Sequence, residues 1–518
     1  MNNSAVLQEP ISRKRHFLLN VAWSWLGVAI NILLGLFLSP LLVRRLGVAK
    51  YGVWVLMFST MDYLRLLDFG LRTAVINRCA RQKAQADWHG VNQTINTAIV
   101  YFLAMSGVCC GVALLLRDPA MTLFKIDPAL QPDARLLLVI IALSISARLI
   151  SSPITAALEA FQRFDLINRA YIGNLTVRAI GSLTLLLCGY GLVPLGLLVL
   201  GVAVGEDLWN FLSLRRVFPA LRFSPHLVSR AAFAPMLGYG KHSAVMTVAN
   251  MIELQVPATM LGSLRGPTDV AFFALPWRLL MYTTEAFSKV GQITSSVTAE
   301  LDVRRDARSV WNMAVETNRH CLGLFMPAAI FLCVFATPLL TVWVSPEVGR
   351  HSGRILPVLV IPFLLAIAGQ INSGSVLLGQ AKHQAYAWSI VLETVAMIVA
   401  IFFVAPGSGA YGVAWVVAIA LTSVRGVVLA VLMCRANAFS IPRYLHAIYT
   451  RPLVSAVPVA VLAVVLRATV FPGRGWLELG CAGVIVATSY FGIAFFVVLD
   501  ATTRRQIVRT AVTVPRLP

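Results

Sequence analysis

Charged residues are scarce in this chain, and acidic residues are the scarcer kind. Only 13% of the 518 residues are charged, with 22 acidic against 43 basic side chains, whereas hydrophobic residues make up 58%. A soluble chain of this length needs far more polar surface. The composition therefore excludes an ordinary soluble protein, and the mean hydropathy of +0.78 indicates a membrane protein.

Cysteine pairs and nucleotide motifs are missing as well. The eight cysteines form no CxxC pair and lie mostly in apolar stretches, which predicts packing residues and no disulfide framework or metal site. No phosphate-binding loop is present, so we expect no cofactor and no use of ATP. The basic N-terminal segment leads into an apolar run of about 22 residues, too long for a signal peptide, which predicts a retained first span.

About fourteen apolar stretches follow one another, each about as long as the twenty helical residues that cross a ~30 Å hydrocarbon layer. The expected fold is all-α and polytopic, with two pseudo-symmetric six-helix lobes and an extra C-terminal helix pair. Short connectors leave no room for an extramembrane domain. The expected segments are a cytoplasmic tail (1–16), an N-lobe with spans 1–6 (17–217), a basic connector (218–232), a C-lobe with spans 7–12 (233–435), spans 13–14 (452–499) and a basic cytoplasmic tail (500–518).

The basic residues have a preferred side. If the spans alternate from a cytoplasmic N-terminus, most Lys and Arg residues fall on cytoplasmic segments, which is the positive-inside bias. This predicts that both termini are cytoplasmic. The net charge of +21 is then explained by topology and by attraction to anionic lipid, so we expect no nucleic-acid partner.

The two blocks of six spans resemble each other. A constant shift of 219 residues puts Gly47 on Gly266 and Arg163 on Lys382. One offset that serves points far apart in the chain indicates an internal duplication. Because six is an even number, the halves should share one orientation, and the seam between two such lobes is the expected place for a substrate and for alternating access.

Three short motifs carry a family resemblance. They are LGVAKYG (46–52), DFGL (68–71) with the basic Arg78 after it, and the connector EAFQRFDLIN (159–168). With the span pattern, they resemble the polysaccharide flippases of the multidrug/oligosaccharidyl-lipid/polysaccharide exporter superfamily.

The resemblance implies a transporter and not an enzyme. It implies translocation of a polyprenyl-pyrophosphate-linked oligosaccharide from the cytoplasmic to the outer leaflet of a bacterial inner membrane, for lipopolysaccharide or exopolysaccharide synthesis. A coupling ion, either a proton or sodium, would drive the cycle. Membrane lipids and the polysaccharide polymerase machinery are the other candidate partners.

Charges inside the spans need an explanation, because each costs on the order of 2.5–3.5 kcal/mol at the bilayer centre on insertion scales. The second span carries a series spaced by three, three and four residues: Asp62, Arg65, Asp68 and Arg72. The eighth carries a series spaced by four, three and four: Arg278, Tyr282, Glu285 and Lys289. Each spacing predicts one continuous helical face, directed away from lipid toward a shared cavity.

A lipid diphosphate carries about two to three negative charges, and guanidinium groups bind phosphate oxygens bidentately. The first candidates for pyrophosphate contact are Arg65, Arg278 and Lys289, and the second are Arg148, Arg178 and Lys241. Pairing with nearby acids is the alternative for each of these residues. For Lys241, near the cytoplasmic start of span seven, an interfacial snorkelling role is a further alternative.

Coupling and gating residues are predicted from the same spans. Mid-span carboxylates that could change charge or hold a cation are Asp62, Glu253 and Glu285, and a permanent partnership with an arginine is the alternative. Pro257 and Pro276 remove backbone donors from spans seven and eight, which makes them candidate gate positions. Ordinary membrane-helix prolines are the alternative.

Two other functions remain as alternatives. A multidrug or organic-cation antiporter of the same superfamily should have an acidic or apolar cavity, which the basic residues Arg65, Arg278 and Lys289 argue against. A polymerase or glycosyltransferase that uses the same lipid carrier needs a sizeable outward loop with catalytic groups. The outward connectors here are short, so we expect no enzyme.

Overall fold

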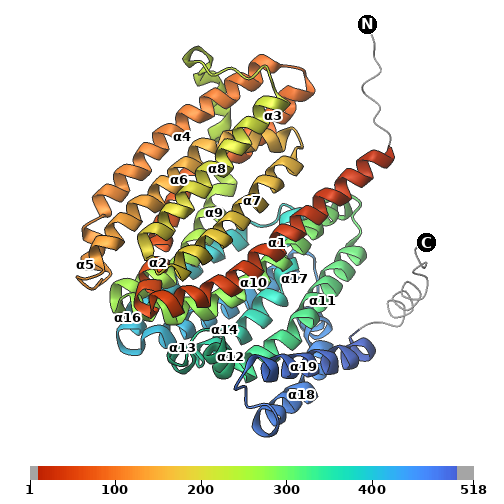
Figure 1. Cartoon of the computed structure of the whole chain (residues 1–518). Coiled ribbons are helices and arrows are strands. Elements are labelled where there is room, and N and C mark those ends of the chain that lie inside the picture. The colour runs from red at the N-terminus through yellow and green to blue at the C-terminus, as the bar shows by residue number, and fades with distance from the viewer. Residues whose placement is uncertain (1–9, 499–518) are drawn as a thin grey trace, which may run out of the picture. The chain divides into compact units, whose positions relative to one another are not determined.

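The computed structural model describes the backbone of residues 10–498 (Figure 1). Side chains are described except in parts of 10–28, 231–250 and 283–296 and at 367–368, and the expected tail 500–518 lies outside the described residues. Every regular element in residues 10–498 is helical. The chain divides into two compact units, unit 1 (Met1–Ala271) and unit 2 (Phe272–Pro518).

Unit 1 is built around one central helix, α6 (Gln131–Ala160), which packs against seven other elements of the unit. Most of the apolar run of α6 is buried, as expected for a helix without a continuous polar face. Figure 1 shows α4, α6 and α8 side by side. The other elements are α1 (Pro10–Leu46), α2 (Val48–Asp62), η1 (Tyr63–Asp68), α3 (Leu71–Ala84), α4 (Trp88–Leu116), α5 (Pro119–Leu123), α7 (Phe164–Leu187), α8 (Leu192–Val217), η2 (Pro225–Leu227) and α9 (Arg230–Arg265).

Unit 2 begins within α10 (Pro267–Val303) and is centred on α11 (Ala307–Val334). The final pair, α18 (Ile441–Thr469) and α19 (Trp476–Val497), packs against α11 and forms a helical hairpin (Figure 1). The remaining elements are α12 (Ala336–Trp343), α13 (Pro346–Ser352), α14 (Ile355–Pro362), the π-helix η3 (Phe363–Ala368), α15 (Ile371–Gly379), α16 (Gln384–Leu421), the π-helix η4 (Thr422–Val428) and α17 (Leu429–Ala436).

The lengths of the helices fit a membrane protein with many crossings. Ten helical segments among the described residues are long and apolar enough to cross a bilayer, and one of them, Gln384–Ala436, is 53 residues long. That segment kinks at Gly409, where φ is 57°, and has room for two crossings. The 36-residue α9 and the 37-residue α10 are also long enough to cross a bilayer. The predicted all-helical polytopic fold is confirmed.

The predicted duplication is visible in the ends of the helices. α1 and α9 end at Leu46 and Arg265, and α2 and α10 begin at Val48 and Pro267, in both cases with the shift of 219 residues. Gly47 and Gly266 stand between them with φ of 88° and 95°. Only glycine adopts this backbone conformation without strain, which explains why the same residue type occupies both turns.

The same shift relates two helix caps. The Asp87 carboxylate accepts the Gly90 N–H at 2.8 Å at the start of α4, and the Asp306 carboxylate accepts the Ser309 N–H at 3.0 Å at the start of α11. The Ser309 hydroxyl also donates to Asp306, at 2.6 Å. These hydrogen bonds stabilise the ionised form and lower the pKa of the Asp306 carboxyl.

The basic connector 218–232 lies along α4 of unit 1. Asn92 donates to the Ala220 carbonyl at 3.1 Å and accepts the Arg222 N–H at 2.8 Å. Asn96 donates to the Arg222 carbonyl at 2.7 Å and accepts the Ser224 N–H at 3.1 Å. The helix that follows, α9, packs against α2, α3 and α4. Unit 1 therefore includes one helix more than the N-lobe expected to end at 217.

Candidate functional site

The charged part of the second span is bent. A 3₁₀ segment, η1, follows α2 at Tyr63, and Phe69 and Gly70 then adopt left-handed conformations with φ of 45° and 73°. α3 starts at Leu71, where the Asp68 carboxylate accepts the Arg72 N–H at 3.0 Å. The prediction of one continuous helical face from Asp62 to Arg72 is therefore wrong, because two consecutive left-handed residues redirect the chain within the DFGL motif.

The first half of that series faces polar groups of α9. Arg65 Nη1 lies 3.8 Å from Asp62 Oδ1, and Gln255 Nε2 donates to Asp62 Oδ2 at 3.4 Å. The hydroxyls of Tyr63 and Thr259 are 3.0 Å apart. The Arg65 side chain remains 65% exposed despite its ion pair. The structure thus brings together one candidate phosphate ligand and one candidate coupling carboxylate.

The second half of the series has a different role. Arg72 forms an ion pair with Glu159 at the end of α6, with 2.5 Å between Nη2 and Oε1. Lys83, further along α3, donates to the Phe161 carbonyl at 3.5 Å and lies 5.1 Å above the centre of the Phe161 ring. These contacts attach α3 to the connector after α6. Arg72 and Lys83 are therefore both engaged with residues of the EAFQRFDLIN connector.

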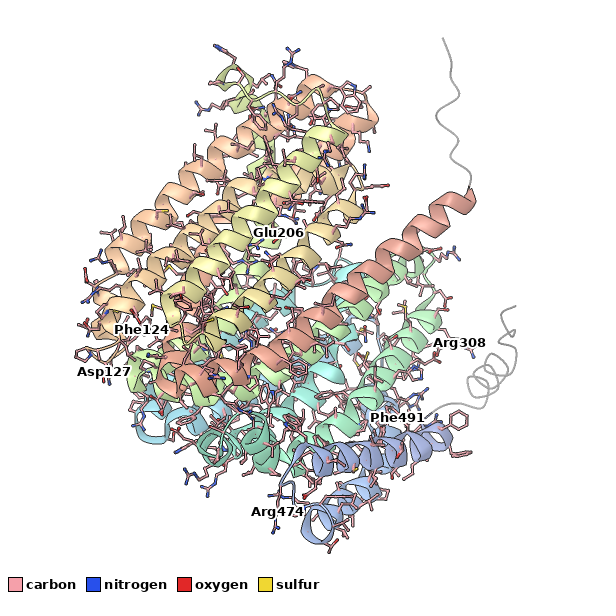
Figure 2. The ribbon with its side chains drawn as sticks, in the orientation of Figure 1. Phe124, Asp127, Glu206, Arg308, Arg474 and Phe491 are labelled. Atoms are coloured by element: carbon pink, nitrogen blue, oxygen red, sulfur yellow. The ribbon has the colours of Figure 1, made fainter. Side chains whose placement is uncertain are left out.

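A second charged cluster lies among α6, α7 and α8. Glu206 Oε2 accepts from Arg148 Nη2 at 2.8 Å and from Asn174 Nδ2 at 2.6 Å. Figure 2 shows Glu206 well away from both ends of the helices of unit 1. The sequence singled out Arg148 but missed the partners Asn174 and Glu206. A lone acidic pair in the apolar sequence of α8, Glu206 and Asp207, was the available signal.

The other residues predicted to bind the diphosphate or the coupling ion fall into two groups, those whose side chains the structure describes and those whose side chains it does not. Arg278 lies exposed on α10, Glu253 is buried in α9, and Arg178 is half-buried on α7, one turn after Asn174. The side chains of Lys241, Glu285 and Lys289 lie outside the described residues, although their backbones belong to α9 and α10.

The predicted gate prolines lie inside helices. Pro257 and Pro276 are buried, and the helical assignment of α9 and α10 continues through both positions. Interruptions of regular α-helix that the structure does describe include the 3₁₀ segment η1 in unit 1 and the π-helices η3 and η4 in unit 2. A role of the two prolines as gates stays a prediction.

A buried polar network that sequence reasoning missed supports the π-helix η3. Asn318 of α11 donates to the hydroxyls of Ser373 and Tyr444 at 3.0 and 3.1 Å. Ser373 also donates to Gln370 Oε1 at 2.7 Å, and Gln370 Nε2 donates to the Tyr449 hydroxyl at 3.1 Å. Tyr444 and Tyr449 both lie on α18. The network therefore connects the C-terminal helix pair to the interrupted helix α14–η3–α15.

Two repeated halves of long apolar helices, with arginines and carboxylates inside them, are typical of polytopic membrane transporters. Residues 17–295, more than half of the chain, match the family described as polysaccharide biosynthesis protein, and the chain belongs to that family.

Individual proteins with a similar sequence or fold agree with this. The chain is 23% identical to the uncharacterized membrane protein EpsK of Bacillus subtilis (strain 168), over 95% of this chain and 97% of EpsK. Its fold resembles that of the lipid II flippase MurJ in an inward closed conformation, with a TM-score of 0.67, 14% identity, and 92% and 99% of the two chains covered.

It also resembles an inward-facing multidrug resistance MATE transporter of the MOP superfamily, with a TM-score of 0.66 and 16% identity over 81% of this chain and 95% of the transporter. The predicted relationship to the polysaccharide flippases of the exporter superfamily is confirmed.

Proposed function

We propose that the chain is a secondary transporter that moves a polyprenyl-pyrophosphate-linked oligosaccharide from the cytoplasmic to the outer leaflet of a bacterial inner membrane. The observation that carries the proposal is the exposure of two arginines at membrane depth. The Arg65 and Arg148 side chains are 65% and 47% exposed, although Arg148 lies within the apolar helix α6 and Arg65 lies in η1 of the predicted second span. Each guanidinium already faces one carboxylate, Asp62 or Glu206, and its exposed donors can bind a further anion, which a diphosphate headgroup supplies.

The same role is proposed for Arg278 and Lys289 and, as second choices, for Arg178 and Lys241. Guanidinium groups that bind the diphosphate offset the cost of taking its charges out of water. Alternating access then moves the headgroup while the polyprenyl tail stays in lipid. The solved structure of a lipid II flippase has this fold, which supports a lipid-linked substrate.

Uptake of a coupling ion by Asp62, Glu253 or Glu285 is proposed to drive the cycle, with both termini in the cytoplasm. Of these carboxylates, Asp62 already has Arg65 and Gln255 as neighbours, so it would exchange those contacts for a proton or sodium ion. Replacing Glu285 by Gln should change the ion or pH dependence of transport. An unchanged dependence would remove Glu285 from the coupling role.

The test is transport in proteoliposomes of a polyprenyl diphosphate that carries a fluorescent oligosaccharide. Arg65→Ala and Arg278→Ala should each slow transport about tenfold or more, the loss expected for about 1.4 kcal/mol of binding. Arg304→Ala is the matched control, because Arg304 is an exposed arginine outside the spans that pairs with Glu300. Normal transport by both span variants contradicts the proposed ligands.

The competing function is export of organic cations, because a multidrug transporter shares the fold. Cells that express the chain should gain no resistance to cationic drugs if the lipid-linked substrate is correct. Resistance that disappears in Asp62→Asn but persists in Arg65→Ala would favour the multidrug alternative.

A further inference from the structure

Glu206 holds a cation and a neutral donor at a single carboxylate oxygen. Its Oε2 accepts from Arg148 Nη2 at 2.8 Å and from Asn174 Nδ2 at 2.6 Å, so α6, α7 and α8 meet at this atom. The Glu206 side chain is only 9% exposed, whereas that of Arg148 is 47% exposed. The Glu206 carboxylate is therefore buried in unit 1, whereas the Arg148 side chain is partly exposed at its surface.

The guanidinium of Arg148 has N–H donors that the pair with Glu206 does not use. Arginine presents five N–H donors in a planar fork, of which the hydrogen bond to Glu206 engages Nη2 alone, and the Asp207 carboxylate also interacts electrostatically with Arg148. Nε and Nη1 can therefore serve a second anion while Nη2 remains with Glu206. Because the cluster lies well inside the helices (Figure 2), such an anion has to be one that enters the membrane region.

The internal repeat matches two residues of this cluster with ionisable residues of unit 2. The shift of 219 residues puts Asn174 on Glu393 of α16 and Glu206 on Arg425 of η4. Only the Glu206 position is ionisable in both halves, with the sign reversed, because Asn174 is neutral and Arg148 falls on Ile367. Charge at this one position of both repeats is consistent with a role in each half.

We propose that Glu206 is a positioning residue that shares Arg148 with the diphosphate and limits how tightly the substrate is held. This inference rests on the proposed function, since it concerns one of the arginines assigned to the headgroup. Glu206 fixes the guanidinium through Nη2, so that Nε and Nη1 are preorganised for phosphate oxygens. Its negative charge also repels the bound diphosphate, which keeps binding weak enough for release.

The inference predicts opposite effects on affinity and turnover. A substrate that is held too tightly is released more slowly. Removing the repulsion by Glu206 should therefore lower both the half-saturation concentration and the maximal rate of transport. A residue that only supports the fold would instead lower the amount of active protein and leave the half-saturation concentration unchanged.

The decisive variant is Glu206→Gln, because glutamine keeps the size of the side chain and an oxygen acceptor for Arg148 and Asn174. Equilibrium binding of polyprenyl diphosphate to the purified full-length variant should tighten about tenfold, which corresponds to about 1.4 kcal/mol. Polyprenyl monophosphate, with less charge to repel, should gain less. Adding Arg148→Ala to Glu206→Gln should abolish the gain.

The controls separate this inference from the proposed function. Glu300→Gln removes a carboxylate from an exposed Arg–Glu pair outside the spans and should change no affinity. Unchanged or weaker diphosphate binding by Glu206→Gln overturns the inference, as does an equal gain for monophosphate and diphosphate. Failure of the unmodified protein to transport the labelled lipid would overturn the proposed function, whereas the binding comparison still decides the role of Glu206.

Discussion

Arg72 and Glu159 are 87 positions apart in the chain, and their side chains meet in an ion pair of 2.5 Å. The pair joins the residue directly after the DFGL motif to the first residue of the EAFQRFDLIN connector. Asp68 holds the start of α3 through the Arg72 N–H, and Leu71 is buried. The two motifs therefore fix a bend and its attachment to α6, which is a structural explanation for their residues.

A double-mutant cycle should measure this attachment. Arg72→Ala and Glu159→Ala should show a coupling energy of about 1–3 kcal/mol, because both partners are part-buried and the contact is non-local. Thermal unfolding of the purified protein in detergent gives the energies. The exposed pair Arg304–Glu300 is the control, and its expected coupling is about 0.3–0.5 kcal/mol. Equal coupling in both pairs would contradict a special role of Arg72.

The second glycine of LGVAKYG is predicted to be indispensable to packing. A Cβ on Gly52 would lie 1.9 Å from the Pro267 carbonyl oxygen, so Gly52→Ala must displace backbone and should cost about 1–3 kcal/mol. Gly107 of α4 has no neighbour within 4 Å of the same position. Gly107→Ala should therefore stabilise the helix by about 0.5–1 kcal/mol. Unfolding midpoints of the two variants should move in opposite directions.

Local signals explain why much of the fold is predictable from the sequence. Gly47 and Gly266 mark the turns between helices, and Asp87 and Asp306 mark helix starts, because each acts on neighbouring residues. Apolar length identifies most spans for the same reason. The 219-residue shift then relates these points in the two halves, so that an expectation for one half applies to the other.

The site was less predictable because its contacts are non-local. Phe69 adopts a left-handed conformation, which is rare for a bulky residue. The sequence therefore carries no signal for the helix break after Asp62. Glu206 acquires its role only through Arg148, 58 positions away in the chain. The spacing of charges along one helix cannot reveal either feature.

Matching caps in the two halves should have matching effects. Asp87→Ala should cost about 1 kcal/mol and increase hydrogen exchange in the first turn of α4. Asp306→Ala should likewise increase hydrogen exchange in the first turn of α11. Since its hydrogen bonds lower the pKa of Asp306, its contribution is complete above the ordinary carboxyl pKa of 3.8 and is lost as the pH falls through the lowered value. Asp306→Asn should remove this pH dependence, and exchange that is unaffected by either alanine variant would contradict the caps.

The π-helix η3 is expected to depend on one tyrosine of the C-terminal helix pair. The Tyr449 hydroxyl donates to the Leu365 carbonyl inside η3 at 2.5 Å and accepts from Gln370 Nε2 at 3.1 Å. A Cβ on Gly369 would lie 2.5 Å from the same hydroxyl, so the tyrosine is closely seated. η3 in turn packs against the second π-helix, η4. π-helical segments such as η3 and η4 are frequent at functional sites.

Tyr449→Phe removes both hydrogen bonds without changing the ring, and it leaves a buried carbonyl and amide without that partner. The variant should lose about 1–3 kcal/mol in detergent unfolding. It should also show faster hydrogen exchange across 363–370, because the carbonyl of Leu365 is no longer fixed. Tyr411→Phe, on the exposed face of α16, is the control and should change neither quantity. If exchange increases equally in both variants, Tyr449 does not brace η3, and the C-terminal pair must be attached to unit 2 mainly by its apolar contacts with α11.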